Sequence, residues 1–274
     1  MVKALILVVS LQLSLFALNP IITDQIKSII EIKDFNQHKK LINIIFDNED
    51  AFIHNGKAKT IKIIKKLKDN GLLKLYFSKP QLIDVTFQTG GNALFFIKIL
   101  RDTLRSIGYY RYFTMHSVRD HTSFIWKIQF KSEYAIDPVV LEEALAKRNC
   151  SINSINRTSA TQWNYSIDIE NAHLSLQTIY PYQPNELKKS LRPYLINIEK
   201  GRKLTLHTKG GDAWFPDIAI FDEKMRLLKV YKRKKRTKEI VFYLPKESVY
   251  MKITDSFNQS NLRHGLSLLL EGEK

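Results

Sequence analysis

The chain has 274 residues, a formal net charge of +16 and 44% hydrophobic residues. This apolar content can build packed cores, which excludes an intrinsically disordered chain, and only ten Gly and eight Pro exclude a fibrous protein. The length predicts two or three domains. Cys150 is the single cysteine, which excludes an internal disulfide and a cysteine metal site. We expect its thiol to be buried and inert.

The first 18 residues have the three-part form of a secretory signal. Lys3 gives a positive start, an apolar run follows, and Ala17 is the small residue near its end, with Asn19-Pro20 expected to break the helix. The run is shorter than the about 20 residues that span a bilayer. We therefore expect residues 1–18 to be a cleaved signal peptide; an uncleaved membrane anchor and a core helix are the alternatives. The lack of disulfides favours a bacterial periplasm.

Residues 19–76 are predicted to form a helical segment. Thr23 or Asp24 could cap a first helix, and apolar spacing predicts a second helix over residues 35–46. A third helix is predicted over residues 57–70, where Asn70-Gly71 supplies a left-handed stop. Lysines cover its polar side, so this helix is either the solvated face of a bundle or a surface for an anionic membrane.

Residues 77–175 are predicted to form a ferredoxin-like βαββαβ domain. Alternation predicts a strand over residues 82–87, and an apolar helix follows over residues 93–107. Residues 112–115 and 124–130 are predicted to form a hairpin. Asp137-Pro138 then begins the next helix, because Asp is a good cap and Pro fits the first helical position. Residues 151–155 and 164–169 are predicted to return as strands.

Residues 176–200 are predicted to be a linker with one helical turn, because residues 180–196 hold three of the eight prolines. Residues 201–274 are predicted to form an antiparallel, jelly-roll-like β-sandwich. Six short strands separated by turn residues support this prediction, over residues 204–207, 217–221, 227–231, 239–244, 249–253 and 265–270. The expected fold class is therefore α+β.

Two resemblances bear on the expected function. Pro216-Asp217 through Asp222, with the later strand from Tyr250 through Asp255, resembles the β-sandwich of bacterial pre-peptidase C-terminal domains. That resemblance implies a non-catalytic appendage of an exported protein. The whole chain resembles a family of periplasmic proteins of ε-class proteobacteria, through the run from Leu67 to Pro80. Some proteins of that kind are scaffolds around the flagellar motor, which implies a role in assembly.

A run of seven basic residues within residues 229–238 is the most specific surface feature. We expect a hairpin loop that projects positive charge toward an acidic protein or an envelope polyanion, with membrane-surface contact as a further possibility. A solvated turn is the alternative. The candidate partner-binding residues are those of the run and two at the tip of the middle hairpin: Lys229, Lys232, Arg233, Lys234, Lys235, Arg236, Lys238, Arg119 and His121.

Three further clusters of residues are candidate sites for small ligands. Gly90-Gly91-Asn92 at a helix start could present N–H groups to an anion, but a tight turn explains the same residues. His116, His121 and Asp120 could ligate zinc, although a closed site requires four ligands. The carboxylates of Asp212, Asp217, Asp222 and Glu223 could bind calcium or be solvated turns. We expect no metal and no cofactor.

The sequence holds no G-x-S-x-G, S-x-x-K or H-E-x-x-H motif, so we do not expect an enzyme. The expected function is that of an exported, periplasmic binding or assembly protein. A cytoplasmic nucleic-acid-binding protein, using the ferredoxin-like sheet and the basic run together, is the alternative, although the signature of RNA-recognition strands is missing. An enzyme of unknown class is the third possibility.

Overall fold

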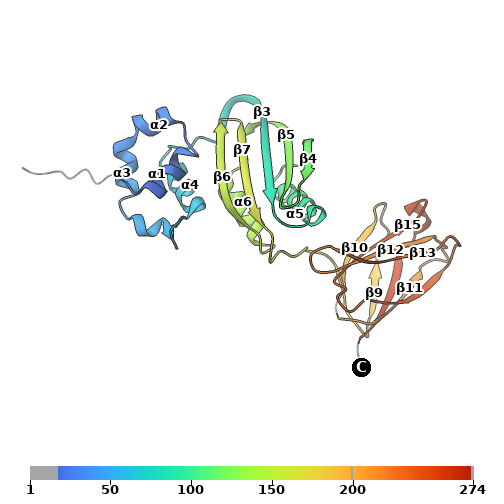
Figure 1. The fold of residues 1–274 in the computed structure, drawn as a ribbon. Coiled ribbons are helices and arrows are strands. Elements are labelled where there is room, and N and C mark those ends of the chain that lie inside the picture. The colour runs from blue at the N-terminus through green and yellow to red at the C-terminus, as the bar shows by residue number, and fades with distance from the viewer. Residues whose placement is uncertain (1–17, 199, 273–274) are drawn as a thin grey trace, which may run out of the picture.

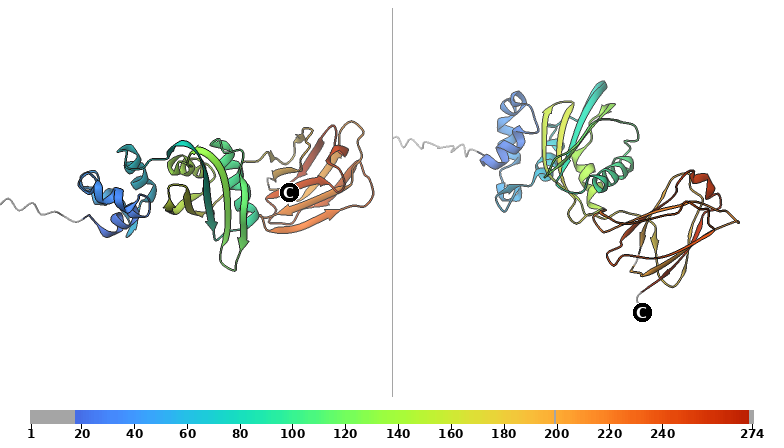
Figure 2. Two further views of the ribbon diagram at one scale, coloured as in Figure 1. Left: turned by 90° about the horizontal axis from the view of Figure 1, so that it is seen from above. Right: turned by 45° about the vertical axis from the view of Figure 1, so that its right-hand side comes forward.

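The computed structural model describes residues 18–198 and 200–272. Three parts follow one another along the chain, namely a helical segment, a middle sheet with two helices, and a pair of C-terminal sheets (Figures 1 and 2). The chain is a mixed α+β protein, as predicted. The predicted signal peptide lies, except for Leu18, outside the described residues. Among the described residues, no helix is both long and apolar enough to cross a membrane.

The helical segment consists of short helices and one small hairpin. Its elements are α1 (Pro20–Lys27), α2 (Ile32–Gln37), α3 (Lys39–Ile45), η1 (Glu49–Ala51), β1 (Ile53–His54), β2 (Lys57–Ala58) and α4 (Thr60–Asp69). Asn19 and Pro20 begin α1, because the Asn19 side chain accepts a hydrogen bond from the Ile21 N–H (2.9 Å) and Pro20 fits the first helical position. The predicted break of a preceding helix concerns residues outside the described part of the chain.

Two of the predicted helices differ from the observed ones. The helix predicted over residues 35–46 is divided at His38 into α2 and α3. The third helix, α4, begins at Thr60 because Asn55 and Gly56 both have positive φ and turn the β1–β2 hairpin before it. At its other end α4 stops at Asn70-Gly71, as predicted.

The middle part is a five-stranded sheet in the order β4-β5-β3-β7-β6. Its elements are β3 (Tyr76–Thr89), α5 (Ala93–Ser106), β4 (Phe113–Arg119), β5 (Phe124–Tyr134), α6 (Pro138–Ala146), β6 (Ser151–Ser159) and β7 (Gln162–Asp168). Asp137 caps α6 by accepting a hydrogen bond from the Val139 N–H (2.9 Å), as predicted. Along the chain the element order is βαββαββ, with β7 as an additional last strand. In the sheet β7 lies between β3 and β6 and runs parallel to β3.

The helical segment and the middle sheet share one hydrophobic core. Buried side chains of both parts belong to a single cluster, among them Ile22, Phe46, Phe87 and Trp163. Polar contacts also join them: Arg157 of β6 donates its backbone N–H to the Ser28 carbonyl (2.8 Å), and Lys68 pairs with Asp137 (2.7 Å). Residue 76 is therefore a boundary in secondary structure but not in the core.

The C-terminal part contains two sheets, of five strands (β13-β12-β15-β10-β8) and four strands (β14-β11-β16-β9). Their elements are β8 (Thr178–Ile179), β9 (Pro184–Leu187), β10 (Tyr194–Ile198), β11 (Lys203–Thr208), β12 (Pro216–Phe221), β13 (Leu227–Lys232), β14 (Glu239–Tyr243), β15 (Tyr250–Asp255), η2 (Gln259–Asn261) and β16 (Leu266–Glu271). Buried residues of both sheets form a second core, among them Ile179, Leu206, Trp214 and Ile218.

The prediction of a linker over residues 176–200 is wrong, because this segment supplies β8, β9 and β10 to the two sheets. Side chains of β10 alternate, with Tyr194, Ile196 and Ile198 buried in the second core. Pro184 begins β9, which lies at the edge of its sheet, and an edge position tolerates the missing N–H. Pro193 directly precedes β10, so two of the three prolines that suggested a linker stand where strands begin.

We expect Ile179→Ala to reduce the free energy of unfolding by about 2–5 kcal/mol, because Ile179 is completely buried in the second core. Denaturant titration measures the change. Leu191→Ala in the same segment is the control, because Leu191 is 77% exposed. A linker would make both substitutions equally harmless, so equal stabilities would contradict the assignment of β8 to the core.

Candidate binding surface

The basic loop, residues 229–238, consists of the last four residues of β13 and the connection that leads to β14. β13 and β14 belong to different sheets, so the predicted hairpin is wrong and the chain crosses from one sheet edge to the other. All seven basic side chains of the loop are exposed, namely Lys229, Lys232, Arg233, Lys234, Lys235, Arg236 and Lys238. The sequence therefore predicted the exposed charge but not the path of the chain.

Three cations of the basic loop contact neighbouring groups. Lys232 pairs with Asp217 of β12 (Nζ–Oδ2 2.9 Å), Lys229 lies over the Tyr231 ring, and Arg236 donates its Nε–H to the Ala213 carbonyl (3.2 Å). Within the described residues, no carboxylate pairs with the other four, which are Arg233, Lys234, Lys235 and Lys238. These four carry positive charge that remains available to a partner.

An aromatic pair lies next to the basic loop. The rings of Phe215 and Phe257 meet edge to face, with centroids 4.7 Å apart, and the Arg236 guanidinium lies 5.8 Å from the Phe215 centroid. Phe257 is 75% exposed although it is a large apolar side chain. This aromatic pair was not predicted from the sequence. The pattern that could have indicated an exposed aromatic ring is a single Phe within the polar residues 256–260.

The buried carboxylate of Asp255 holds both aromatic residues in place. Its Oδ2 accepts hydrogen bonds from the Phe215 N–H (2.8 Å) and from the Asn261 amide (3.0 Å). Its Oδ1 accepts hydrogen bonds from the N–H groups of Phe257 and Asn258 (2.8 Å each). Burial opposes the charge of this carboxylate, but the hydrogen bonds outweigh burial and lower the pKa of Asp255 below its ordinary value.

The hairpin tip that carries Arg119 and His121 belongs to the middle sheet, apart from the basic loop. Arg119 reaches the Gly91 carbonyl at the start of α5 (3.5 Å). Asp120 accepts hydrogen bonds from the backbone of Thr122 and Ser123, and these bonds lower the pKa of Asp120 to about 2. The carboxylate is thus used by its own turn. The two groups of candidate partner residues therefore belong to different parts of the fold.

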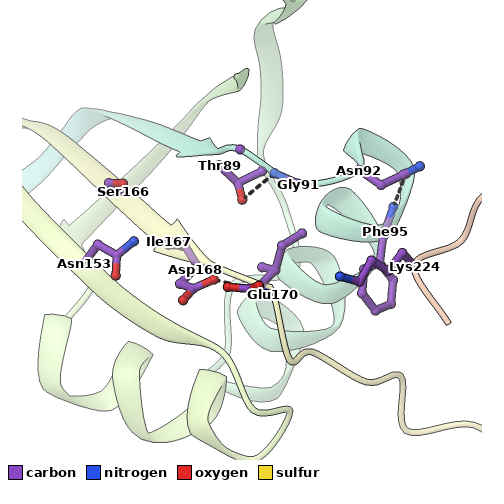
Figure 3. A pocket seen from close by; sticks show the side chains of 12 residues that line it. Thr89, Gly91, Asn92, Phe95, Asn153, Ser166, Ile167, Asp168, Glu170 and Lys224 are labelled. Atoms are coloured by element: carbon purple, nitrogen blue, oxygen red, sulfur yellow. Dashed lines mark hydrogen bonds between the residues drawn. The ribbon is translucent and has the colours of Figure 1, made fainter. Parts of the chain in front are cut away.

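A cavity of about 420 Å³ lies where β3 and β7 end and α5 begins. Figure 3 shows Asp168 and Glu170 on its β7 side and Lys224, which enters from the C-terminal sheets, beside Phe95. The Gly91 N–H is bound to the Thr89 hydroxyl (3.2 Å) and the Phe95 N–H to the Asn92 side chain (3.1 Å). With these donors occupied and two carboxylates present, the geometry favours a tight turn over an anion site.

The four acidic residues considered for calcium do not form one cluster. Asp212 accepts hydrogen bonds from His264, Asp217 pairs with Lys232, and Asp222 binds Arg226. Across residues 18–198 and 200–272, no three His, Cys, Asp or Glu side chains come together as a metal site would require. Cys150 is buried, and burial raises the pKa of its thiol to about 11, which keeps the thiol protonated at neutral pH.

Comparison with protein-family models and with curated proteins found no match for this chain.

We expect Asp255→Asn to destabilise the protein by about 2 kcal/mol, because four hydrogen-bond donors lose a charged, buried acceptor. Denaturant titration at several pH values measures this. Because the folded pKa is lowered, the contribution of the carboxylate is complete well above the ordinary value of 3.8 and is lost as the pH falls through the folded pKa. The two proteins should therefore converge in stability in acid; a constant difference across pH would contradict the role of the charge.

Proposed function

We propose that this chain is an exported, non-catalytic binding or assembly protein of the bacterial cell envelope, which contacts an acidic partner through the basic loop. One observation carries the proposal. The loop projects seven exposed cations, and only Lys232 is paired with a carboxylate of the described residues. Elsewhere, cations such as Lys68 and Lys127 lie against carboxylates that hold elements of the fold together. Unpaired, contiguous charge of one sign is suited to a polyanionic partner.

The proposed periplasmic location follows from the signal-like pattern of residues 1–18 and the single cysteine. We expect mass spectrometry of the protein isolated from its native cell to find a chain that lacks about the first 18 residues. Fractionation of the same cells supplies the control. An intact Met1 on protein in the cytosolic fraction would contradict export.

We also propose that the C-terminal part is a β-sandwich of the kind appended to exported bacterial proteins. Support comes from its two sheets over one core and from two buried carboxylates, Asp222 directly after β12 and Asp255 at the end of β15. Each accepts hydrogen bonds from backbone N–H groups of the turn that follows its strand. The middle part is proposed to be a ferredoxin-like domain extended by β7. The chain order of its first six elements matches that fold, and the strand order β4-β5-β3 agrees with it as well.

The alternative, a nucleic-acid-binding protein, would use the sheet face opposite α5 and α6 together with the basic loop. On that face the cation of Lys127 is paired with Asp84 (2.7 Å), and Asp84 also accepts a hydrogen bond from Gln129 (2.8 Å). A negative carboxylate at the centre of the face and a neutralised lysine do not favour phosphate binding. We therefore centre the proposed partner contact on the basic loop and not on this face of the middle sheet.

We expect the triple substitution Arg233→Gln, Lys234→Gln and Lys235→Gln to weaken partner binding about tenfold, because each exposed cation contributes a modest, salt-dependent attraction. Crosslinking in the native cell followed by mass spectrometry measures the yield of partner-linked protein. The matched control removes three exposed lysines of the helical segment, Lys39, Lys40 and Lys57. Equal crosslinking yields for the two variants would remove the loop from the proposal.

A further inference from the structure

Strand register brings four loops together at one end of the C-terminal sheets. Asp217 pairs with Lys232 and Pro216 with Asp255, so the start of β12 lies beside the ends of β13 and β15. Tyr194 pairs with Ile253, which places the start of β10 at the same end. The loops that follow or precede these positions are residues 188–193, 209–215, 233–238 and 256–265. The C-terminal sheets lie on the opposite side of the molecule from the helical segment (Figure 1).

Two of these loops raise large apolar side chains into solvent. Leu191 is 77% exposed and Phe257 is 75% exposed, which makes them two of the three most exposed large hydrophobic side chains among the described residues. Phe257 is held rigidly, because its backbone N–H binds Asp255 and its ring packs on Phe215. Single exposed apolar side chains are common on protein surfaces, but the exposed Phe257 ring and the half-buried Phe215 ring form one aromatic pair beside Arg236 of the basic loop.

The same loops carry many cations and no free carboxylate. Their exposed basic residues are Lys188, Lys189, Arg192, Arg233, Lys234, Lys235, Arg236, Lys238 and Arg263. The acidic residues around them are also contacted by neighbouring groups. Asp255 accepts hydrogen bonds from N–H groups, Asp217 pairs with Lys232, and Glu186 pairs with Lys209. Asp212 and Glu239 lie against His264 and His207, which offset their charge only when protonated. The end therefore carries an excess of cations, with two apolar tips.

Positive charge continues from this end onto the middle part. Arg192 lines a small cleft of about 210 Å³ together with Lys98, Arg101 and Arg105 of α5. Asp102 offsets one of these charges by pairing with Lys98 (2.7 Å). Guanidinium groups match phosphate oxygens in geometry as well as in charge. The cleft thus extends the cationic surface beside Leu191.

From this arrangement we propose that the end of the C-terminal sheets docks on an anionic lipid bilayer, with Phe257 and Leu191 entering the interface and the surrounding cations contacting lipid phosphates. The proposal rests on the proposed function and names the acidic partner as a membrane surface. Apolar tips within a ring of cations match the layering of a bilayer, where acyl chains lie beneath charged headgroups. An acidic protein would satisfy the cations, but it would also need separate apolar pockets for the two tips.

The test measures cosedimentation of the protein, purified from its native cell, with mixed phosphatidylcholine–phosphatidylglycerol vesicles and with pure phosphatidylcholine vesicles. We expect stronger binding to the anionic vesicles that falls with added salt. Phe257→Ala and Leu191→Ala should each weaken this binding about tenfold, because each removes one apolar anchor. Tyr243→Ala is the matched control, since Tyr243 is 69% exposed at the opposite end of β14. All variants share the same N-terminus, so any contribution of residues 1–18 cancels.

A second variant reports the depth of insertion directly. The native tryptophans Trp126, Trp163 and Trp214 are buried. In Phe257→Trp we therefore expect a blue shift of the emission when anionic vesicles are added, beyond any shift of the unsubstituted protein. No such excess shift would overturn the insertion of this residue. Phe257→Ala loses the ring packing on Phe215 and should unfold at a slightly lower denaturant concentration, so vesicle binding is measured where denaturant titration shows both variants to be folded.

The outcomes separate this inference from the proposed function. Weakened binding in the two apolar variants, with Tyr243→Ala unchanged, supports docking. If the protein ignores anionic vesicles while the Arg233→Gln, Lys234→Gln and Lys235→Gln variant still loses crosslinks to an acidic protein, docking is overturned and the proposed function stands. Vesicle binding that depends on the basic loop but not on Phe257 or Leu191 would show electrostatic adsorption alone and would also overturn the inference.

Discussion

The carboxylate of Asp255 organises the end of the C-terminal sheets. Four hydrogen bonds converge on it, and they join the residue before β12 to the turn after β15. A buried carboxylate is stable only when its oxygens are satisfied, so the chain around it has little freedom to rearrange. As a result, Phe215 and Phe257 form a fixed pair at the surface, and Arg236 of the basic loop lies against it. The position of the basic loop thus depends on a negative charge that is itself hidden from solvent.

Charge in this protein serves two different purposes. At several element ends a carboxylate is matched to a nearby cation, as for Asp222 with Arg226 and Asp137 with Lys68. These pairs fix turns and helix caps, and because they are partly exposed, each contributes little to stability. The net charge of +16 arises because acidic residues are too few to match all the cations. Part of this surplus lies at the end of the C-terminal sheets, where exposed cations surround apolar tips.

Local signals in the sequence predicted elements well and their arrangement less well. Asp137-Pro138 and Asn70-Gly71 marked helix ends correctly, because capping depends on the adjacent residues alone. The six C-terminal strands were found through their alternation, whereas β8–β10 were missed because prolines at strand starts resemble a linker. Insertion of β7 beside β3 depends on long-range pairing that no local pattern encodes. For the surface, the basic run was evident, but Phe257 was not, since its exposure depends on where Asp255 holds the turn.

The two hydrophobic cores determine which part of the fold a partner bound at the C-terminal sheets would contact. The helical segment and middle sheet share the first core, whereas the second core is enclosed by the C-terminal sheets. Side chains of the C-terminal part also pack on the first core: Tyr250 and Met225 are buried in it, and Leu195, Phe221 and Val249 are partly buried against it. The Tyr250 hydroxyl accepts a hydrogen bond from the Leu174 N–H (3.3 Å). A partner bound at the far end contacts the C-terminal sheets and stabilises the part of the fold that it binds. The cleft beside Arg192 would connect such binding to α5. Its cations come from the C-terminal part and from α5 of the middle part, so an anion bound in the cleft would contact both parts.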